Sequence, residues 1–98
     1  MALENIMNEH QRLSILHALA AMDNYSANNA IVQSICAQYG NQMTSDKVAT
    51  HFAWLNEQGL VTTQQLGDYT IATLTKRGSE VERGLASQPG VKRPGPRG

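Results

Sequence analysis

The sequence predicts a mainly α-helical domain that carries one small β-hairpin. Apolar residues recur at helical spacing in three stretches before residue 58, and a β-branched hairpin pattern follows them. Capping residues and glycines mark the element boundaries. The predicted order is three helices, a two-stranded wing and a C-terminal helix, which is the order of a winged helix-turn-helix. We expect this domain to span residues 1–86.

The first helix is expected over residues 3–22, because apolar side chains recur there every three or four positions. The stripe comprises Ile6, Leu13, Leu16 and Ala20, widened by Ile15, Leu19 and Met22. This helix has more apolar positions than one face needs. We therefore expect it to form a homodimer interface together with the C-terminal helix.

The second helix is expected to follow a turn-forming break at residues 23–26. Ser26 or Asn28 is its candidate N-cap, and Gly40 stands where a C-terminal glycine belongs. The apolar positions that fall on one face of this helix are Ile31, Val32, Ile35, Cys36 and Tyr39.

The third helix is expected to begin at Thr44 or Ser45, both of which are good caps. Asp46 in its first turn favours the positive end of the helix. Gly59 ends the helix. The side chains expected to face inward, at helical spacing, are Val48, Phe52 and Leu55.

A β-hairpin and a last helix complete the predicted domain. Residues 60–63 and 69–74 form the two strands, joined at Gly67 and Asp68. Thr75 caps a helix whose apolar residues are Val81 and Leu85. The proline- and glycine-rich residues 87–98 are expected to form a disordered basic tail.

Length and charge limit the classes of function. The chain of 98 residues is one domain with a formal net charge of zero. Three basic residues lie in the tail, so residues 1–88 hold five basic and eight acidic residues, a net of −3. No apolar stretch is long enough to span a membrane. One cysteine excludes an internal disulfide and suits a reducing compartment such as the cytoplasm.

The third helix is the expected reader of a DNA groove in this architecture, which makes double-stranded DNA the expected partner. Its outward face and the residues after the wing supply candidate phosphate and base contacts. The candidate DNA-binding residues are Thr44, Ser45, Lys47, Thr50, His51, Trp54, Lys76 and Arg77.

The same helix has an alternative interpretation. It carries one lysine and no arginine, whereas strong readers usually use arginine for guanine contacts. Its outward face is then a solvated surface of a winged helix that binds protein. Trp54 either marks a contact surface or packs flat against the wing or the first helix. The tail either follows a minor groove or an acidic partner, or is an unstructured solubilising end.

Residue patterns of catalysis and metal binding are missing from the sequence. His10 and His17 are seven residues apart on a helix, about 10.5 Å along its axis, which is too far to share a metal. Cys36 lies on an apolar stripe without a ligand partner and is expected to be a core thiol. We expect no enzyme activity, no cofactor and no metal.

Residues 52–61 and 71–78 resemble an ArsR-type winged helix. Together with residues 9–13 and 89–94, they are similar to a family of small proteins from Mu-like phages and prophages. The resemblance implies a phage-borne, ArsR-like transcriptional regulator acting in the bacterial host cytoplasm. Residues 45–50, which often contain several arginines in that family, are here neutral or acidic apart from Lys47. The cysteine clusters of ArsR metal sensors have no counterpart, so metal control is not carried over.

Two functions follow as hypotheses. The first is a homodimeric winged-helix DNA-binding regulator of phage or prophage origin. The second is a protein-interaction module in phage packaging or morphogenesis, without DNA binding. A groove-facing row of Lys47, Lys76, Arg77 and Arg12 would favour the first hypothesis.

Overall fold

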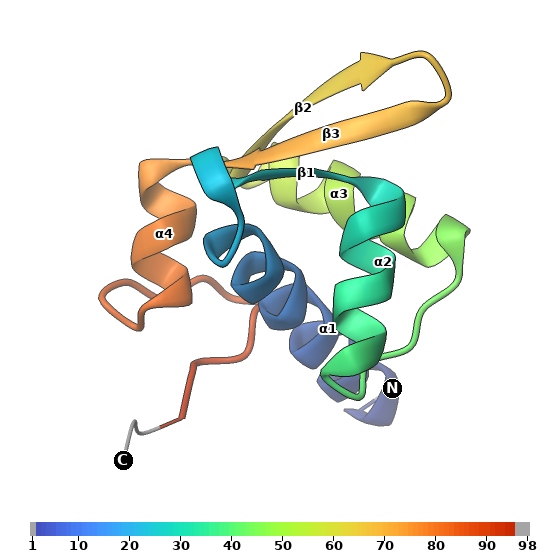
Figure 1. Ribbon diagram of the computed structural model, residues 1–98. Coiled ribbons are helices and arrows are strands. Elements are labelled where there is room, and N and C mark those ends of the chain that lie inside the picture. The colour runs from blue at the N-terminus through green and yellow to red at the C-terminus, as the bar shows by residue number, and fades with distance from the viewer. Residues whose placement is uncertain (1, 96–98) are drawn as a thin grey trace.

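The computed structural model describes residues 2–95, which form a small α+β domain of four α-helices and a three-stranded antiparallel sheet (Figure 1). The three helices, the hairpin and the C-terminal helix follow in the predicted order. The elements are α1 (Ala2–Ala20), the short 3-10 helix η1 (Asp23–Tyr25), β1 (Ser26–Asn28), α2 (Asn29–Gln38), α3 (Ser45–Glu57), β2 (Val61–Leu66), β3 (Tyr69–Leu74) and α4 (Lys76–Glu82).

Three helices begin at a capping side chain, as the sequence predicts. The side chains of Asn28, Thr44 and Thr75 each accept a hydrogen bond from the backbone N–H three residues further on. These bonds satisfy N–H groups that have no partner within the first helical turn. Of the paired alternatives, Asn28 rather than Ser26 caps α2, and Thr44 rather than Ser45 caps α3.

The sheet has the strand order β1-β3-β2. β2 and β3 form the hairpin, and Leu66 pairs with Tyr69 across a two-residue turn. Gly67 in this turn has a φ of +62°, a conformation that favours glycine. β1 was not predicted, and it pairs with β3 through Ala27 and Ala72. Its three residues are too few to show an alternating pattern, and their pairing is long-range.

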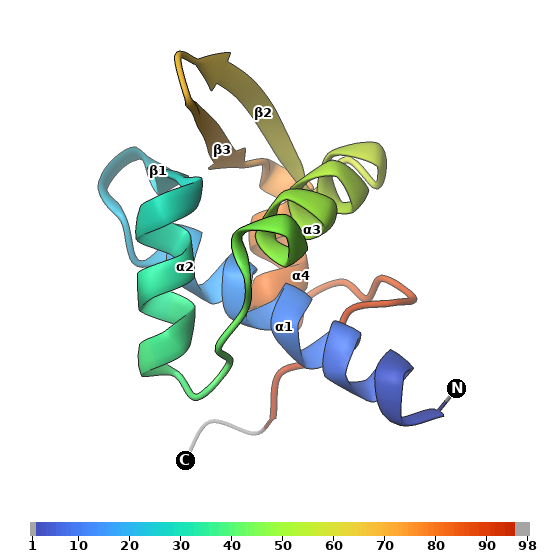
Figure 2. The same ribbon diagram turned by 90° about the vertical axis from the view of Figure 1, so that its right-hand side faces the viewer.

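α1 runs through the centre of the molecule, with α2, α3 and α4 around it and the sheet across one end (Figures 1 and 2). The hairpin projects beyond the helices in both views. Its strand β2 is exposed from its second residue to its last. The largest fully buried apolar side chains are Phe52, Ile15, Leu16, Leu19, Leu55, Leu60, Val32, Val48 and Val61.

Four apolar residues that were predicted to face the core are exposed instead. Leu85 is 70% exposed, because α4 ends at Glu82 and Gly84 follows with a φ of +79°. A glycine with positive φ is a common helix end, so Leu85 lies outside the helix. Ile6, Ile31 and Tyr39 lie on the predicted helices but are 41–50% exposed.

None of the helices described between residues 2 and 95 combines the length and apolar character needed to cross a membrane.

Candidate functional site

The start of α3 carries three of the predicted DNA contacts, and their hydroxyl groups are exposed but engaged locally. Thr44 caps the helix by accepting from the Lys47 N–H at 3.1 Å. Ser45 Oγ donates to Gln33 Oε1 at 3.3 Å, and Thr50 Oγ1 donates to the Asp46 carbonyl oxygen at 2.9 Å. The hydroxyls therefore serve the helix and its packing on α2 in the structure described.

The predicted cations do not form one row. Lys47 is half-buried in the first turn of α3, whereas Lys76 and Arg77 begin α4. Arg77 donates to Gln88 Oε1 at 2.8 Å, and Gln88 donates to Gln58, the residue that ends α3. A helix of 13 residues is about 20 Å long, so Lys47 and Arg77 lie near opposite ends of α3.

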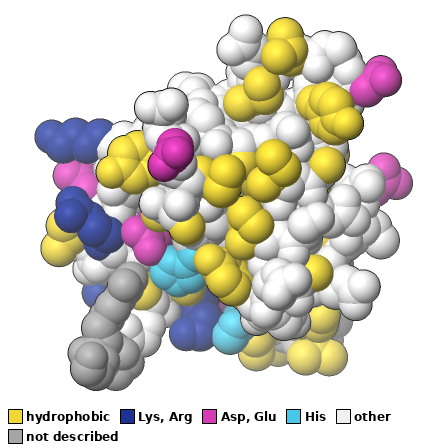
Figure 3. Space-filling view, viewed as in Figure 1, with side chains coloured by type: hydrophobic (Ala, Val, Ile, Leu, Met, Phe, Trp, Pro, Cys, Tyr) yellow, Lys and Arg dark blue, Asp and Glu magenta, His cyan; other side chains and the backbone are white. Residues whose placement is uncertain are grey.

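The outward face of α3 and the hairpin carries little positive charge. Residues 45–74, all of them described, contain one lysine against three carboxylates: Lys47, Asp46, Glu57 and Asp68. In Figure 3 the Lys and Arg side chains gather on the α4 side and along the lower edge, and the hairpin and α2 show none in that view.

His51 was predicted to lie on the exposed face of α3, and this prediction is wrong. It is 1% exposed, because it lies three residues after Val48 and four before Leu55 and so shares their inward face. Its Nε2–H donates to Gln11 Oε1 at 2.8 Å, and its Nδ1 accepts from Arg12 Nε at 3.2 Å. These partners assign the neutral tautomer with the proton on Nε2.

The surroundings of His51 favour that neutral form. Burial lowers the pKa of His51 to about 4 from its usual 6.5, and the cations Arg12 and Lys47 act in the same direction. A protonated ring could no longer accept from Arg12. His51 is therefore a buried polar link between α1 and α3.

Trp54 packs against α1, which confirms one of the two alternatives left open by the sequence. The guanidinium of Arg12 lies over its ring, with 4.0 Å between Cζ and the ring centroid. Stacking of this kind is attractive because the cation meets the negative face of the aromatic ring. Burial lowers the pKa of Arg12, while the nearby carboxylate of Glu9 raises it. The stacking thus occupies both the guanidinium of Arg12 and one face of the Trp54 ring.

Part of the predicted disordered tail is ordered in the structure, and Gly90 and Lys92 contact α1. The Val91 N–H donates to the Gln88 carbonyl oxygen at 3.0 Å and closes a turn with Pro89 and Gly90 at its centre. The Gly90 carbonyl oxygen accepts from Arg12 Nη1 at 3.0 Å. Residues 96–98, including the predicted basic residue Arg97, lie outside the described residues.

Two further contacts hold this segment. The Lys92 N–H donates to the Glu9 carbonyl oxygen at 3.2 Å, and the Val91 side chain is 7% exposed. A Pro-Gly dipeptide is a turn signal, so the turn itself was readable from the sequence. Its contact with Arg12 joins residues 78 positions apart, which no local pattern reveals.

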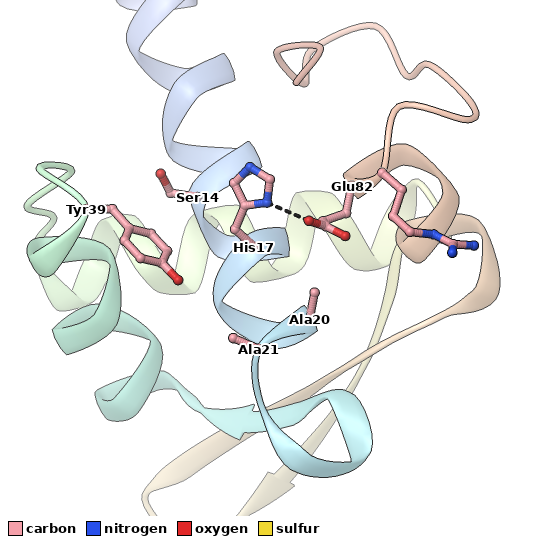
Figure 4. Close-up of a pocket in the computed structure, with 7 residues that line it drawn as sticks. Ser14, His17, Ala20, Ala21, Tyr39 and Glu82 are labelled. Carbon is pink, nitrogen blue, oxygen red and sulfur yellow. Dashed lines mark hydrogen bonds and ion pairs between the residues drawn. The ribbon is translucent and has the colours of Figure 1, made fainter. Parts of the chain in front are cut away.

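A second polar feature lies in a shallow pocket of about 620 Å³ between α1, the end of α2 and α4 (Figure 4). There His17 Nδ1 lies 2.7 Å from Glu82 Oε2. Figure 4 shows this pair in the pocket, with Ser14 and Tyr39 from the α1 and α2 side. The pairing was missed because His17 was considered only as a metal partner of His10.

Metal and thiol chemistry have little support within residues 2–95. The described residues contain no group of three or more His, Cys, Asp or Glu side chains that could hold a metal ion. Cys36 is completely buried, and burial raises the pKa of its thiol to about 11. It is a core residue, as the apolar stripe of α2 predicts.

Comparison with known proteins finds a relative in phage Mu and one in a bacterium. The chain is 41% identical over 95 residues to protein gp26 of Escherichia phage Mu, which covers 97% of this chain and 98% of gp26. It is also 37% identical over 78 residues to a protein of Haemophilus influenzae, covering 79% and 76% of the two chains. The chain belongs to the family of phage Mu gp26.

The comparisons leave the activity of the family open. Both relatives are described as uncharacterized proteins. No family model matches the chain, and no solved structure matches it. The phage association predicted from the sequence is thus supported, while the ArsR-like regulator that the resemblance implied remains a prediction.

Proposed function

We propose that this member of the gp26 family is a winged-helix module that binds protein rather than DNA. In this proposal α2 and α3 form the helix-turn-helix, and the hairpin β2–β3 forms the wing. The order of the elements supports the assignment, together with a hairpin that projects beyond the helical body (Figure 1). β1 adds a third strand beside β3 and anchors the base of the wing.

The functional proposal rests on the low positive charge of α3 and the hairpin, the face that would contact DNA in a winged helix. A DNA-binding surface gains most of its affinity from cations that displace counterions at phosphates. Residues 45–74 offer a half-buried Lys47 against Asp46, Glu57 and Asp68. Arg12 is engaged by Trp54, His51 and Gly90, so it does not extend a row of cations.

The tip of the hairpin has the composition of a protein contact. Leu66 and Tyr69 face each other across the turn and are 59% and 51% exposed. The exposed residues of β2 before Leu66 are neutral threonine and glutamine side chains. Exposed aromatic and aliphatic residues with a neutral polar surround suit a protein interface, from which charges are largely excluded at the centre.

A homodimer is part of the proposal. Leu3, Ile6 and Met7 are 50–70% exposed on the first turns of α1. Their spacing of three and four residues places them on one face of the helix. A second copy of this helix would cover that face. We expect a dimer in sedimentation experiments, and Ile6→Lys should shift it to a monomer, whereas Glu4→Gln should not.

DNA-binding regulation is the alternative, and the exposed hydroxyls of Thr44, Ser45 and Thr50 at the start of α3 favour it. The two functions are separated by fluorescence anisotropy with random-sequence duplex DNA at about 50 and 200 mM salt. We expect no binding at either concentration. Affinity that falls steeply with salt, and that Lys47→Ala weakens, would instead establish a DNA reader.

Protein binding is tested directly by affinity capture from phage-infected cells. The bait is the full chain, compared with the double variant Leu66→Ser, Tyr69→Ser and with the matched variant Thr62→Ser, Thr63→Ser. We expect captured proteins that the first variant loses and the second retains. Equal capture by all three baits would remove the hairpin tip as the binding surface.

A further inference from the structure

We propose that Glu9, Arg12 and Trp54 form a binding site for a Pro-Gly turn of a peptide, which residues 88–92 fill as a displaceable strap. The strap is defined as residues 88–92. The inference deepens the proposed function, on which it rests for the kind of competing ligand, a segment of another protein. It adds a second surface, separate from the hairpin tip, and states what that surface recognises.

The shape of the site selects glycine at one position. Gly90 has a φ of +96°, which favours glycine, and the position of its missing side chain is occupied by the Trp54 ring. A Cβ atom at this residue would lie 2.6 Å from Trp54 Cζ2 and 3.1 Å from Arg12 Nη1. Proline before this glycine presets the turn, because it fixes φ at the first central position. The site therefore fits Pro-Gly at the centre of a turn.

The polar contacts of the site are made to the peptide backbone. Arg12 Nη1 donates to the Gly90 carbonyl oxygen, and the Glu9 carbonyl oxygen accepts from the Lys92 N–H. Any segment with the same turn offers the same carbonyl and N–H. The site can select a side chain at the position of Val91, because that side chain is buried. The recognised pattern is a Pro-Gly turn followed by an apolar residue.

The strap is attached in a way that permits release. Among residues 87–95, Val91 is the one buried residue, and Gln88 makes one exposed bond to Arg77 and one half-buried bond to Gln58. The strap follows α4 and contributes no strand or helix to the fold. Its departure leaves the pairing of the sheet and the capping of the helices intact. It would uncover the Trp54 ring and free one donor of Arg12 for a partner.

The first test uses the fluorescence of Trp54, the single tryptophan of the chain. In the full chain, Gly90→Ala should displace the strap, so we expect a red-shifted emission maximum and stronger acrylamide quenching, with an unchanged far-ultraviolet circular dichroism spectrum. Gly95→Ala is the matched control, since a Cβ there meets nothing within 4 Å. An unchanged emission spectrum, or loss of helical signal in Gly90→Ala, would overturn a displaceable strap.

The second test supplies the ligand in trans. A synthetic peptide with the sequence of residues 87–95 is titrated into full-length Gly90→Ala protein. We expect a saturable return of the emission maximum toward that of the wild type. The same peptide carrying Gly90→Ala should have no effect. Failure of the unsubstituted peptide to bind would overturn the site.

These measurements use neither DNA nor the hairpin tip. Their failure leaves the test of the proposed function standing, and a DNA-binding result in that test leaves the strap measurements standing. The two inferences are therefore separately falsifiable.

Discussion

The two sides of α3 differ in how their polar groups are used. On the packed side, toward α1 and the strap, Arg12 donates a hydrogen bond to His51 and stacks on Trp54. On the projecting side, the outer face of α3 and the hairpin present exposed, mostly neutral residues. The side chains that would attract attention as ligand-binding groups thus hold the domain together. The side expected to read DNA is the one with little charge.

The largest expected difference between the packed body of the domain and the projecting hairpin comes from a pair of glycines. Gly78 in α4 lies against the backbone of Leu60, where an added Cβ would overlap the carbonyl oxygen. We expect Gly78→Ala to lower the free energy of unfolding by about 3 kcal/mol or more, because the overlapped atom belongs to the backbone.

The matched change on the projecting side is Gly67→Ala in the hairpin turn. Its Cβ meets nothing within 4 Å, so only the positive φ of +62° is strained. We expect a loss of about 1 kcal/mol. Urea denaturation of both variants measures the difference, and equal losses would contradict the division into a packed and a projecting side.

The second prediction concerns the pH dependence contributed by His51. Its pKa is about 4 in the folded chain against 6.5 as an ordinary histidine, so the unfolded chain binds more protons between these values. Stability therefore falls as the pH is lowered from about 6.5 to about 4, by about 3 kcal/mol in total. The measurement is the free energy of unfolding at a series of pH values.

The control for this titration is His51→Gln, which lacks an ionisable group at the same place. We expect its stability to vary less with pH over that interval, after allowance for the pH dependence of the other groups. Parallel pH profiles for the two proteins would show that His51 does not carry the effect.

A third prediction separates the geometry of Arg12 from its charge. Arg12→Ala removes the stacking on Trp54 and the bonds to His51 and Gly90, which should cost about 2 kcal/mol. Arg12→Lys keeps the charge but lacks the planar fork, so we expect it to recover less than half of that loss. Thermal unfolding of the three proteins makes the comparison, and full recovery by lysine would argue that charge alone matters.

The smallest predicted effect is on the projecting side, at the start of α3. Thr44→Ala removes the N-cap bond to the Lys47 N–H and should lower stability by about 1 kcal/mol. Ser45→Ala, next to it and also exposed, should change stability by less than about 0.5 kcal/mol. Equal effects of the two substitutions would contradict the assignment of Thr44 as the cap.

Local chemistry explains why most of the fold was predictable. Helix caps and tight turns depend on residues that are close together in the sequence, so a local pattern predicts them. This holds for the caps Asn28, Thr44 and Thr75 and for the turn at Gly67. β1 was missed because its three residues become a strand only through pairing with β3. Leu85 was misassigned because Gly84, a helix-ending signal, was given too little weight.

The candidate site was less predictable, for a related reason. His51 was assigned to the surface by its polarity, although its spacing from Val48 and Leu55 places it inward. Its polar partner Gln11 lies 40 residues away in the sequence. Sequence spacing does not indicate that a buried His51 would find this hydrogen-bond partner. The strap combines a readable turn at Pro89 and Gly90 with a docking place on α1 that depends on tertiary contact.

The burial of Cys36 removes the thiol of this domain from redox chemistry. With a thiol pKa of about 11, only about one molecule in ten thousand carries the reactive thiolate at neutral pH. The side chain is also sealed from oxidants and from other thiols, and the chain has no second cysteine. Disulfide formation should thus play no part in the stability of the described domain.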